Sequence, residues 1–263
     1  MLIQADATHA PLRPKSVQVV VTSPPYLEQR CYGDSDTELG HEGTLKEYVK
    51  NLVDVLDQAR GPLGYLADNG LLWLNIGDKS NGSGGAGGDW NPKEGSSQIK
   101  RQGRGAKRFD DPNYQLGSFL DVPGAVVREM LHRGWRLRAS IIWNKGSRAP
   151  ESLVHCGRPG RSHEPIFMFA PSTKRSYFIP DVLDEKGSVW TFPAKSNPAS
   201  PSHLAPFPDE LVKRCILPST KLDDVVYDPF DGSGTTRRVA EQFGRRGVGT
   251  DIYTTTKGTH NDQ

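Results

Sequence analysis

Cysteine is scarce in this chain of 263 residues, and long apolar runs are missing. The three cysteines (Cys31, Cys156 and Cys215) stand apart with no CxxC pair, which excludes a disulfide framework and a four-cysteine zinc site. No run reaches the roughly 18 apolar residues that suggest a membrane span, so we expect no membrane partner. Residues 1–15 lack the apolar core of a signal peptide, which predicts a cytoplasmic protein.

Signatures of metal and triphosphate binding are also missing. The spacing of His155, Cys156 and His163 matches no common zinc pattern, and we predict no metal site. The glycine-rich segment at 228–236 lacks the Gly-Lys-Ser/Thr of a phosphate-binding loop. A nucleoside triphosphate is therefore an unexpected ligand.

Net charge is small, at +2, but it is unevenly distributed. Residues 128–161 carry eight basic and two acidic side chains, whereas residues 1–80 carry seven and eleven. Such a basic segment is either an ordinary solvated face or a surface that contacts the phosphates of a nucleic acid. Charge by itself leaves both interpretations open.

Short apolar segments alternate in type along the chain. The β-branched run at 17–21 and the apolar run at 70–76 predict strands buried in a parallel sheet. Thr44 and Glu47 match a capping box, and apolar residues then recur at helical spacing, which predicts a helix over 45–59. Further strands are expected at 1–5, 137–143, 164–169, 224–227 and 247–250, and helices at 123–133, 208–217 and 235–243. The alternation predicts an α/β fold.

Two long segments have no apolar periodicity. Residues 79–113 are dense in Gly, Ser, Lys and Arg, and residues 171–207 are rich in Pro and Ser. The first cannot bury enough apolar area to order itself, and loops of this length inside a domain are usually functional or disordered. We expect one domain over 1–263 with inserted loops at about 79–113, 145–163 and 171–200.

The C-terminal part contains a βαβ unit with a glycine-rich turn. The glycines let backbone N–H groups approach a ligand, and the N-terminus of the following helix favours an anionic group. Asp228 at the start of the turn would suit an ammonium, and Asp251, 23 residues further along, can accept ribose hydroxyls. An ammonium, a carboxylate and a ribose together describe S-adenosylmethionine. The alternative is that Asp228 and the glycines form only a tight turn.

A second motif, Thr22-Ser-Pro-Pro-Tyr26, follows a buried strand directly. Two prolines fix the backbone and remove two N–H donors, so their carbonyls remain as acceptors in defined directions. Together with the Ser23 hydroxyl and the Tyr26 ring, they can hold an exocyclic amino group while the ring stacks on a flat heterocycle. The alternative is a rigid loop exit with a packed tyrosine.

Together the two motifs resemble those of the DNA amino-methyltransferases that modify N4 of cytosine or N6 of adenine. Residues 23–26 match the family's (D/N/S)PP(Y/F), and residues 228–236 match its DPFxGSGTT. The order of the motifs is that of the subgroup in which the target-base motif precedes the cofactor motif. Weaker matches are His203–Leu211 to HPAxFPxxL with Leu204 in place of Pro, His163-Glu164 before an apolar strand, and Gln4-Ala-Asp6. The resemblance spans about residues 2–252.

The resemblance implies a Rossmann-like S-adenosylmethionine-dependent methyltransferase fold. Its sheet would be seven-stranded and mostly parallel, with permuted motif order. The strand ending at Asp6 should then lie beside the strand ending at Asp251. The whole chain would be a single catalytic domain whose inserted loops contact DNA.

The resemblance also assigns roles to the residues of both motifs. The Ser23 hydroxyl and the Pro24 carbonyl would accept the two amino hydrogens of a flipped base, with Pro25 fixing the turn and Tyr26 stacking on the ring. Transfer would be a direct in-line displacement that depends on positioning. The expected cofactor residues are Asp228 at the methionine ammonium, Phe230 packing beside it, Asp251 at the ribose, Asp6 at the adenine amino group, Gly232, Gly234, Thr235 and Thr236 in the turn, and His203 and Phe207 at the methionine side.

Double-stranded DNA is the partner that the resemblance implies. Parts of 79–113 or 171–200 are expected to read bases. Cys31 is interpreted as structural or incidental, because the Pro-Cys pair of C5-cytosine enzymes is absent. The resemblance leaves open a homodimer and a cognate restriction endonuclease as a separate chain. The basic residues expected to hold phosphates are Arg101, Arg104, Lys107, Arg108, Lys145, Arg148, Arg158 and Arg161.

Serine in the first motif position favours N4 of cytosine as the target. N6 of adenine is the alternative, because the two amino groups present similar geometry. A methyltransferase of RNA or protein, and a catalytically silent nucleic-acid-binding module with the same fold, are further alternatives. The presence of Ser23, Asp228 and the glycines speaks against the silent module.

Overall fold

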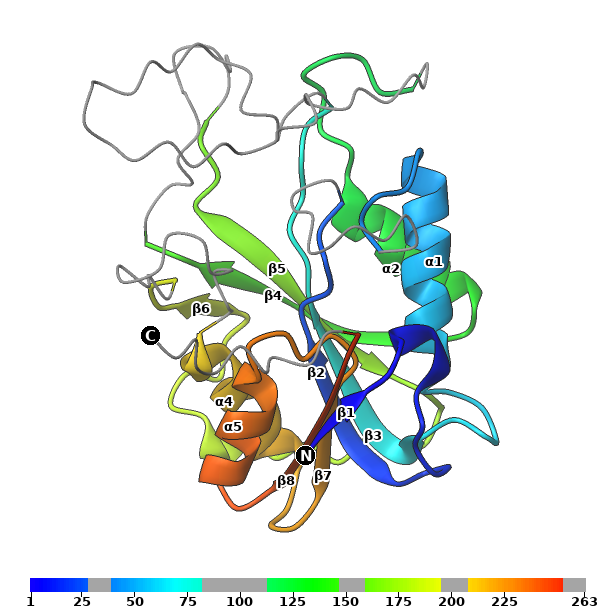
Figure 1. Ribbon diagram of the computed structural model, residues 1–263. Helices are drawn as coiled ribbons and strands as arrows, with labels where there is room; N and C mark the ends of the chain where they lie inside the picture. The colour runs from blue at the N-terminus through cyan, green and yellow to red at the C-terminus, as the bar shows by residue number, and fades with distance from the viewer. Residues whose placement is uncertain (28–38, 82–112, 147–158, 195–207, 253–263) are drawn as a thin grey trace, which may run out of the picture.

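The computed structural model describes residues 1–27, 39–81, 113–146, 159–194 and 208–252, and the structural statements below concern these residues. Their strands form one sheet in the order β1-β8-β7-β2-β3-β5-β4-β6 (Figure 1). The strands are β1 (Leu2–Gln4), β2 (Val17–Thr22), β3 (Leu66–Asn75), β4 (Arg136–Asn144), β5 (His163–Ala170), β6 (Val189–Thr191), β7 (Val225–Asp228) and β8 (Arg246–Asp251). The helices are α1 (Leu45–Asp57), α2 (Val122–His132), α4 (Asp209–Ile216) and α5 (Thr235–Gln242), with short 3-10 helices η1 (Ala7–His9), η2 (Pro180–Val182) and η3 (Leu217–Ser219).

The sheet is mostly parallel, as expected, but its expected strand number is wrong. Eight strands are present among the described residues, and only β5 runs antiparallel to its neighbours. The strand that the sequence did not indicate is β6, inside a stretch expected to be irregular. It is three residues long, which is too short to show a period. Trp190 anchors it, with its ring centroid 6.1 Å from that of Trp73, so a tertiary contact decides its place.

The first and last strands lie side by side, which confirms the expected permuted arrangement. β1 pairs with β8 in parallel, with Gln4 opposite Asp251. The N–H of Ala5 then donates to the Asp251 carbonyl over 3.1 Å. The chain therefore begins beside the strand that ends its βαβ unit.

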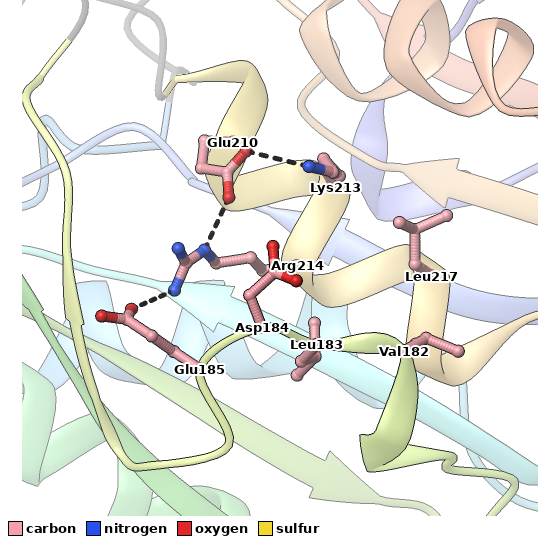
Figure 2. Close-up of a pocket in the computed structure, with 8 residues that line it drawn as sticks. All are labelled: Val182, Leu183, Asp184, Glu185, Glu210, Lys213, Arg214 and Leu217. Atoms are coloured by element: carbon pink, nitrogen blue, oxygen red, sulfur yellow. Dashed lines mark hydrogen bonds and ion pairs between the residues drawn. The ribbon is translucent and has the colours of Figure 1, made fainter.

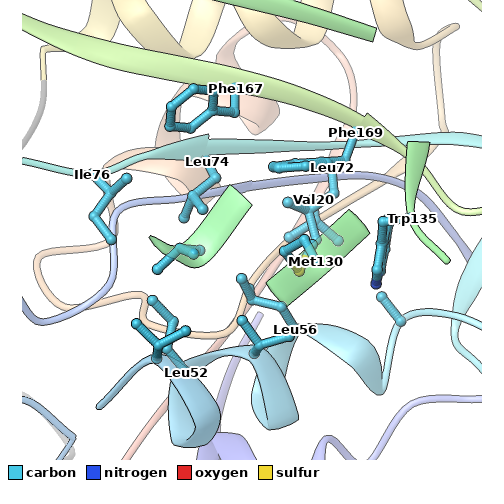
Figure 3. Close-up of a cluster of buried hydrophobic side chains, with 14 of the residues drawn as sticks. Val20, Leu52, Leu56, Leu72, Leu74, Ile76, Met130, Trp135, Phe167 and Phe169 are labelled. Carbon is cyan, nitrogen blue, oxygen red and sulfur yellow. The ribbon is translucent and has the colours of Figure 1, made fainter. Parts of the chain in front are cut away.

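Helices cover both faces of the sheet. α1 and α2 pack on one face, and α4 and α5 on the other (Figure 1). Consecutive residues of β2 serve the two faces in turn: Val20 enters the first hydrophobic cluster and Val19 and Val21 the second. Figure 3 shows the first cluster, in which Leu52 and Leu56 of α1 face Leu72 and Leu74 of the sheet.

The helix ends follow the expected local signals. The Thr44 hydroxyl accepts a hydrogen bond from the N–H of Glu47 at the start of α1. Gly134 after α2 and Gly244 after α5 take the left-handed conformation, with φ of +89° and +74°. Backbone positions of this kind favour glycine because it has no Cβ, so the two expected helix stops are confirmed.

Candidate active site

The polar groups of interest gather at one edge of the sheet. β2, β3, β7 and β8 are parallel and end there, and the antiparallel β5 begins there. In open α/β sheets this edge is the usual ligand site. The side chains that the fold brings to it are Ser23 after β2, Asn75 at the end of β3, Lys145 after β4, Glu164 in β5, Asp228 at the end of β7 and Asp251 at the end of β8.

The Ser-Pro-Pro-Tyr turn is held from helix α1. The Tyr48 hydroxyl, which is fully buried with its side chain, donates to the Pro25 carbonyl over 2.9 Å. The Ser23 hydroxyl donates to the Tyr26 hydroxyl over 3.3 Å. The Pro25 carbonyl is therefore used by the fold, which directs attention to the carbonyl of Pro24 as an acceptor for a ligand.

Tyr26 is the centre of the contacts made by this turn. Its hydroxyl donates to Glu164 Oε2 over 3.1 Å and lies 3.4 Å from Asn75 Oδ1. Burial, and then the nearby Glu164 carboxylate, raise the pKa of Tyr26 well above its usual value, so the phenol stays protonated. Its ring rests against Gly77, where a Cβ atom would lie 2.7 Å from Cε2 of the ring.

Glu164 links three side chains at this edge: Tyr26, Asn75 and Lys145. Its Oε2 also accepts from Asn75 Nδ2 over 3.2 Å, and its Oε1 pairs with the Lys145 ammonium. Lys145 lies 4.9 Å from the centre of the Trp143 ring. The lysine that the sequence suggested for phosphate binding therefore faces this cluster, and its contact with DNA stays a prediction.

Asp228 is enclosed at the start of the glycine-rich turn. Its Oδ1 accepts from the Thr22 hydroxyl (2.7 Å) and the N–H of Phe230 (3.0 Å), and its Oδ2 accepts from the Thr236 hydroxyl (2.8 Å). Burial raises its pKa to about 7, the charge of Asp231 adds to the rise, and the three hydrogen bonds oppose it. The side chain is 1% exposed, so these contacts join the two motifs, and the expected contact with an ammonium stays a prediction.

The glycine-rich turn has the conformation that its glycines allow. Gly232 and Gly234 have φ of +49° and +75°. The N–H of Gly232 donates to Asp251 Oδ2 over 3.0 Å, which ties the turn to the end of β8. Thr235 and Thr236 begin α5 and are buried.

Phe230 and Asp6 lie beside this turn. Phe230 is partly buried against the first hydrophobic cluster. Asp6 is exposed two residues after the Gln4 and Asp251 pair, and its Oδ1 accepts from the N–H and the hydroxyl of Thr8, both at 2.8 Å. The carboxylates expected to hold a ribose and an adenine amino group therefore share one corner of the sheet.

Several expected site residues lie outside the described residues, and their roles stay predictions. Arg161 is described: its guanidinium donates to the Asp78 carbonyl and lies 5.7 Å from the Phe119 ring centre. Outside the description are His203 and Phe207 of the cofactor set and Arg101, Arg104, Lys107, Arg108, Arg148 and Arg158 of the DNA set.

Sequence reasoning gave no role to four residues that shape the site: Thr22, Tyr48, Asn75 and Gly77. Thr22 and Asn75 are polar residues that end apolar strands, a signal that could have marked them. Tyr48 lies one turn into a helix whose start the sequence shows clearly, but nothing local indicates what its hydroxyl reaches. Gly77 matters only because the Tyr26 ring is packed against it.

The described residues offer no other strong candidate site. They contain no group of three or more His, Cys, Asp or Glu that could hold a metal ion, and no helix among them is long and apolar enough to cross a membrane. A pocket beside α4 is lined by eight residues (Figure 2). Among its charged groups Arg214 pairs with Glu185 and Glu210, and none of the lining residues belongs to either motif.

Known proteins resemble this chain over most of its length. Residues 17–258 match the family model described as a DNA methylase, of the N6/N4 methyltransferases. The Type II methyltransferase M.Cfr9I of Citrobacter freundii is 37% identical over 246 residues, covering 90% of this chain and 77% of that protein. The Type II methyltransferase M.SmaI of Serratia marcescens is 35% identical over 244 residues, covering 89% and 79%.

Solved structures share the fold at lower identity. The PvuII DNA methyltransferase (cytosine-N4-specific) matches with a TM-score of 0.68 and 20% identity, covering 96% of this chain and 81% of that one. The 'Putative DNA Modification Methylase' TTHA0409 of Thermus thermophilus, solved in complex with S-adenosyl-L-methionine, matches with a TM-score of 0.61 and 22% identity, covering 96% of this chain and 89% of that one. These matches confirm the expected Rossmann-like α/β fold.

Proposed function

The chain belongs to the DNA methylase family of N6 and N4 amino-methyltransferases, and from this premise we propose that it transfers a methyl group from S-adenosylmethionine to N4 of a cytosine flipped out of duplex DNA. The observation that carries the proposal is that both motifs meet at one sheet edge. Thr22, directly before the Ser-Pro-Pro-Tyr turn, donates to Asp228, which opens the glycine-rich turn.

The cofactor side of the proposal uses the corner between β7, β8 and β1. When bound there, S-adenosylmethionine supplies an electrophilic methyl group. Gly232 and Gly234 shape the turn that leads into the N-terminus of α5, a place that favours a carboxylate. The remaining proposed contacts are Asp251 with the ribose, Asp6 with the adenine amino group, Phe230, Asp228, Thr235 and Thr236 around the methionine part, and His203 and Phe207 closing that side.

The base side uses the Ser-Pro-Pro-Tyr turn. Ser23 Oγ and the Pro24 carbonyl accept the two hydrogens of the amino group, while Tyr26 stacks on the flipped base and Pro25 holds the turn. Accepting both hydrogens turns the nitrogen lone pair out of conjugation with the ring. The nitrogen then points along the line of transfer, so catalysis comes chiefly from positioning, and the amine loses its proton after its charge develops.

Serine in the first motif position is what favours cytosine over adenine. The basic residues proposed from the sequence would hold the DNA phosphates, so the affinity for DNA should fall with rising salt. Because relatives at 35–37% identity are named Type II methyltransferases, we also propose that the chain is the modification enzyme of a restriction system whose endonuclease is a separate chain.

One experiment tests the reaction and the base together. The protein is incubated with duplex DNA and labelled S-adenosylmethionine, the DNA is digested to nucleosides, and the labelled nucleoside is identified by mass spectrometry. We expect N4-methylcytosine. N6-methyladenine would assign the target to adenine, label in RNA or protein alone would replace DNA as the substrate, and no transfer to any of them would overturn the proposal. Ser23→Ala serves as the inactive control that still binds the cofactor.

A further inference from the structure

We propose that Glu164 is a positioning residue that sets the direction of the hydrogen bonds between itself, Tyr26 and Ser23, and so makes the Ser23 hydroxyl an acceptor for the amino group of the target base. The inference rests on the proposed function. The family resemblance marked His163-Glu164 without giving Glu164 a role. The contacts of its side chain supply one.

The direction follows from the number of hydrogens available. An ionised carboxylate can only accept, so the single hydrogen of the Tyr26 hydroxyl goes to Glu164 Oε2. The Tyr26 oxygen is then left with lone pairs, and the hydrogen of the Ser23 hydroxyl, 3.3 Å away, fills one of them. Ser23 has no second hydrogen, so its own lone pairs are what it can present to a ligand.

A Ser23 hydroxyl whose hydrogen points to Tyr26 suits the amino group of a base, whereas one whose hydrogen points to the base does not. An exocyclic amine offers two hydrogens and needs two acceptors. If the Ser23 hydrogen pointed toward the base, a donor would face a donor, and one buried hydrogen would be left without an acceptor. Glu164 therefore acts on the base through Tyr26 and Ser23, without touching the base.

Asn75 reinforces the same direction. Its Nδ2 donates to Glu164 Oε2 and to the Pro165 carbonyl, both at 3.2 Å. This orientation turns its Oδ1 toward the Tyr26 hydroxyl, at 3.4 Å. Whether the Tyr26 hydrogen is given to Glu164 or to Asn75, it points away from Ser23, and in both cases the Glu164 carboxylate is what orients the donors.

Lys145 completes the arrangement on the other side of the carboxylate. Its ammonium pairs with Oε1, and the two side chains are only 23% and 18% exposed. The lysine balances the charge of a largely buried carboxylate and occupies one of its oxygens. The other oxygen remains for Tyr26 and Asn75.

Glu164→Gln tests the inference because glutamine has one oxygen and one NH2 group in place of two oxygens. The Lys145 ammonium attracts the amide oxygen, and the NH2 group then faces Tyr26. This reverses the direction of the hydrogen bonds from Ser23 through Tyr26 to residue 164. We expect turnover to fall roughly 10- to 100-fold, the effect of one misdirected hydrogen bond in the transition state. Affinity for S-adenosylmethionine and the thermal midpoint of unfolding should stay at the wild-type values, since the cofactor corner is untouched.

Two combinations separate this role from a merely structural one. In a Tyr26→Phe background, which lacks the linking hydroxyl, Glu164→Gln should cause no further loss of turnover. In a Lys145→Met background the amide is free to turn its oxygen to Tyr26, so Glu164→Gln with Lys145→Met should recover turnover to within a few-fold of Lys145→Met alone. Asp181→Asn, in the exposed pair with Lys186, is the matched control and should leave turnover unchanged.

A binding measurement tests the direction of the Ser23 hydrogen bond without relying on turnover. The target base in duplex DNA is replaced by its analogue without the amino group: pyrimidin-2-one for cytosine, or purine for adenine. Loss of the amino group also weakens the base pair and eases flipping in every variant, so the quantity compared is the ratio of the affinities for the two duplexes. Glu164→Gln should shift this ratio toward the analogue relative to the wild-type protein.

Additive losses with Tyr26→Phe, or an unchanged ratio of the two affinities in Glu164→Gln, would overturn the role of Glu164 while leaving the proposed function standing. A wild-type protein that methylates no nucleic acid would overturn both.

Discussion

The two turns at the active edge are held in place in different ways. The glycine-rich turn is organised by bonds between residues close in sequence, such as the N–H of Gly234 with the Asp231 carbonyl and the Thr236 hydroxyl with Asp228. The Ser-Pro-Pro-Tyr turn depends on Tyr48 from α1 and Glu164 from β5, 23 and 138 residues away from their partners. The cofactor turn therefore has local bonds of its own beside those to Asp251 of β8 and to Thr22, whereas the base turn is held mainly by distant residues.

Removing the aromatic ring of the Ser-Pro-Pro-Tyr turn should have the largest effect. Tyr26→Ala loses the surface on which the base stacks and also breaks the bonds to Glu164 and Ser23. We expect turnover to fall by roughly 10²-fold or more, since misplacement of about 1 Å already costs that much. Cofactor affinity, measured by calorimetry, should change less than about twofold because the bonds of the glycine-rich turn remain. A parallel loss of cofactor affinity would contradict the separation of the two turns.

Asp228→Ala should affect both turns, because this carboxylate is the direct bond between them. Two hydroxyls and one N–H lose their acceptor in a buried place, and we expect a loss of about 2–4 kcal/mol of the free energy of unfolding, measured by urea denaturation. Asp228→Asn is the matched control. Its oxygen keeps the Thr22 and Phe230 bonds, and its NH2 group can donate to Thr236, whose hydroxyl then donates to the Val21 carbonyl at 3.2 Å. Equal losses in the two variants would contradict the importance of these bonds.

The difference in the free energy of unfolding between the wild-type protein and Asp228→Asn should depend on pH. Burial raises the pKa of Asp228 from 3.8 to about 7, so the folded state keeps this proton after the unfolded chain has released it. The contribution of Asp228 to stability is therefore present at low pH and is lost as pH rises from about 4 to 7. The asparagine side chain has no proton to release, so the stability of Asp228→Asn relative to wild type should increase across that range in urea titrations. A difference that stays constant with pH would contradict the raised pKa.

A smaller effect is expected from the glycine under the Tyr26 ring. The Cβ atom of Gly77→Ala would lie 2.7 Å from the ring, so the ring or the strand end has to shift. We expect about a tenfold loss of turnover and a loss of about 1–2 kcal/mol of stability. Gly187→Ala is the control, because nothing lies within 4 Å of the added atom there. Full activity in Gly77→Ala would show that the ring position is not tightly required.

Tyr48→Phe should have the smallest effect. It removes only the hydrogen bond to the Pro25 carbonyl, worth about 1 kcal/mol. We expect a few-fold loss of turnover with unchanged cofactor affinity, measured in steady-state kinetics. A loss of cofactor affinity instead would show that α1 supports both turns.

The sequence predicts well what depends on neighbouring residues. The helix cap at Thr44 and the glycine stops at Gly134 and Gly244 all appear, and so does the strand predicted at 17–21, which runs to Thr22. Each rests on local geometry or on a short period. β6 was missed, since three residues show no period and Trp190 finds its neighbour only in the folded chain.

By itself the sequence determined the α/β fold, the two motifs and their order, and hence the family. The tertiary structure decided which partners the site residues have. Asp228 accepts from Thr22, 206 residues away, and Lys145 pairs with Glu164, a partner that the charge pattern could not indicate. The physical reason is that a polar side chain takes the partner that the neighbouring strands present, and strand order is set by how the whole chain packs its two faces.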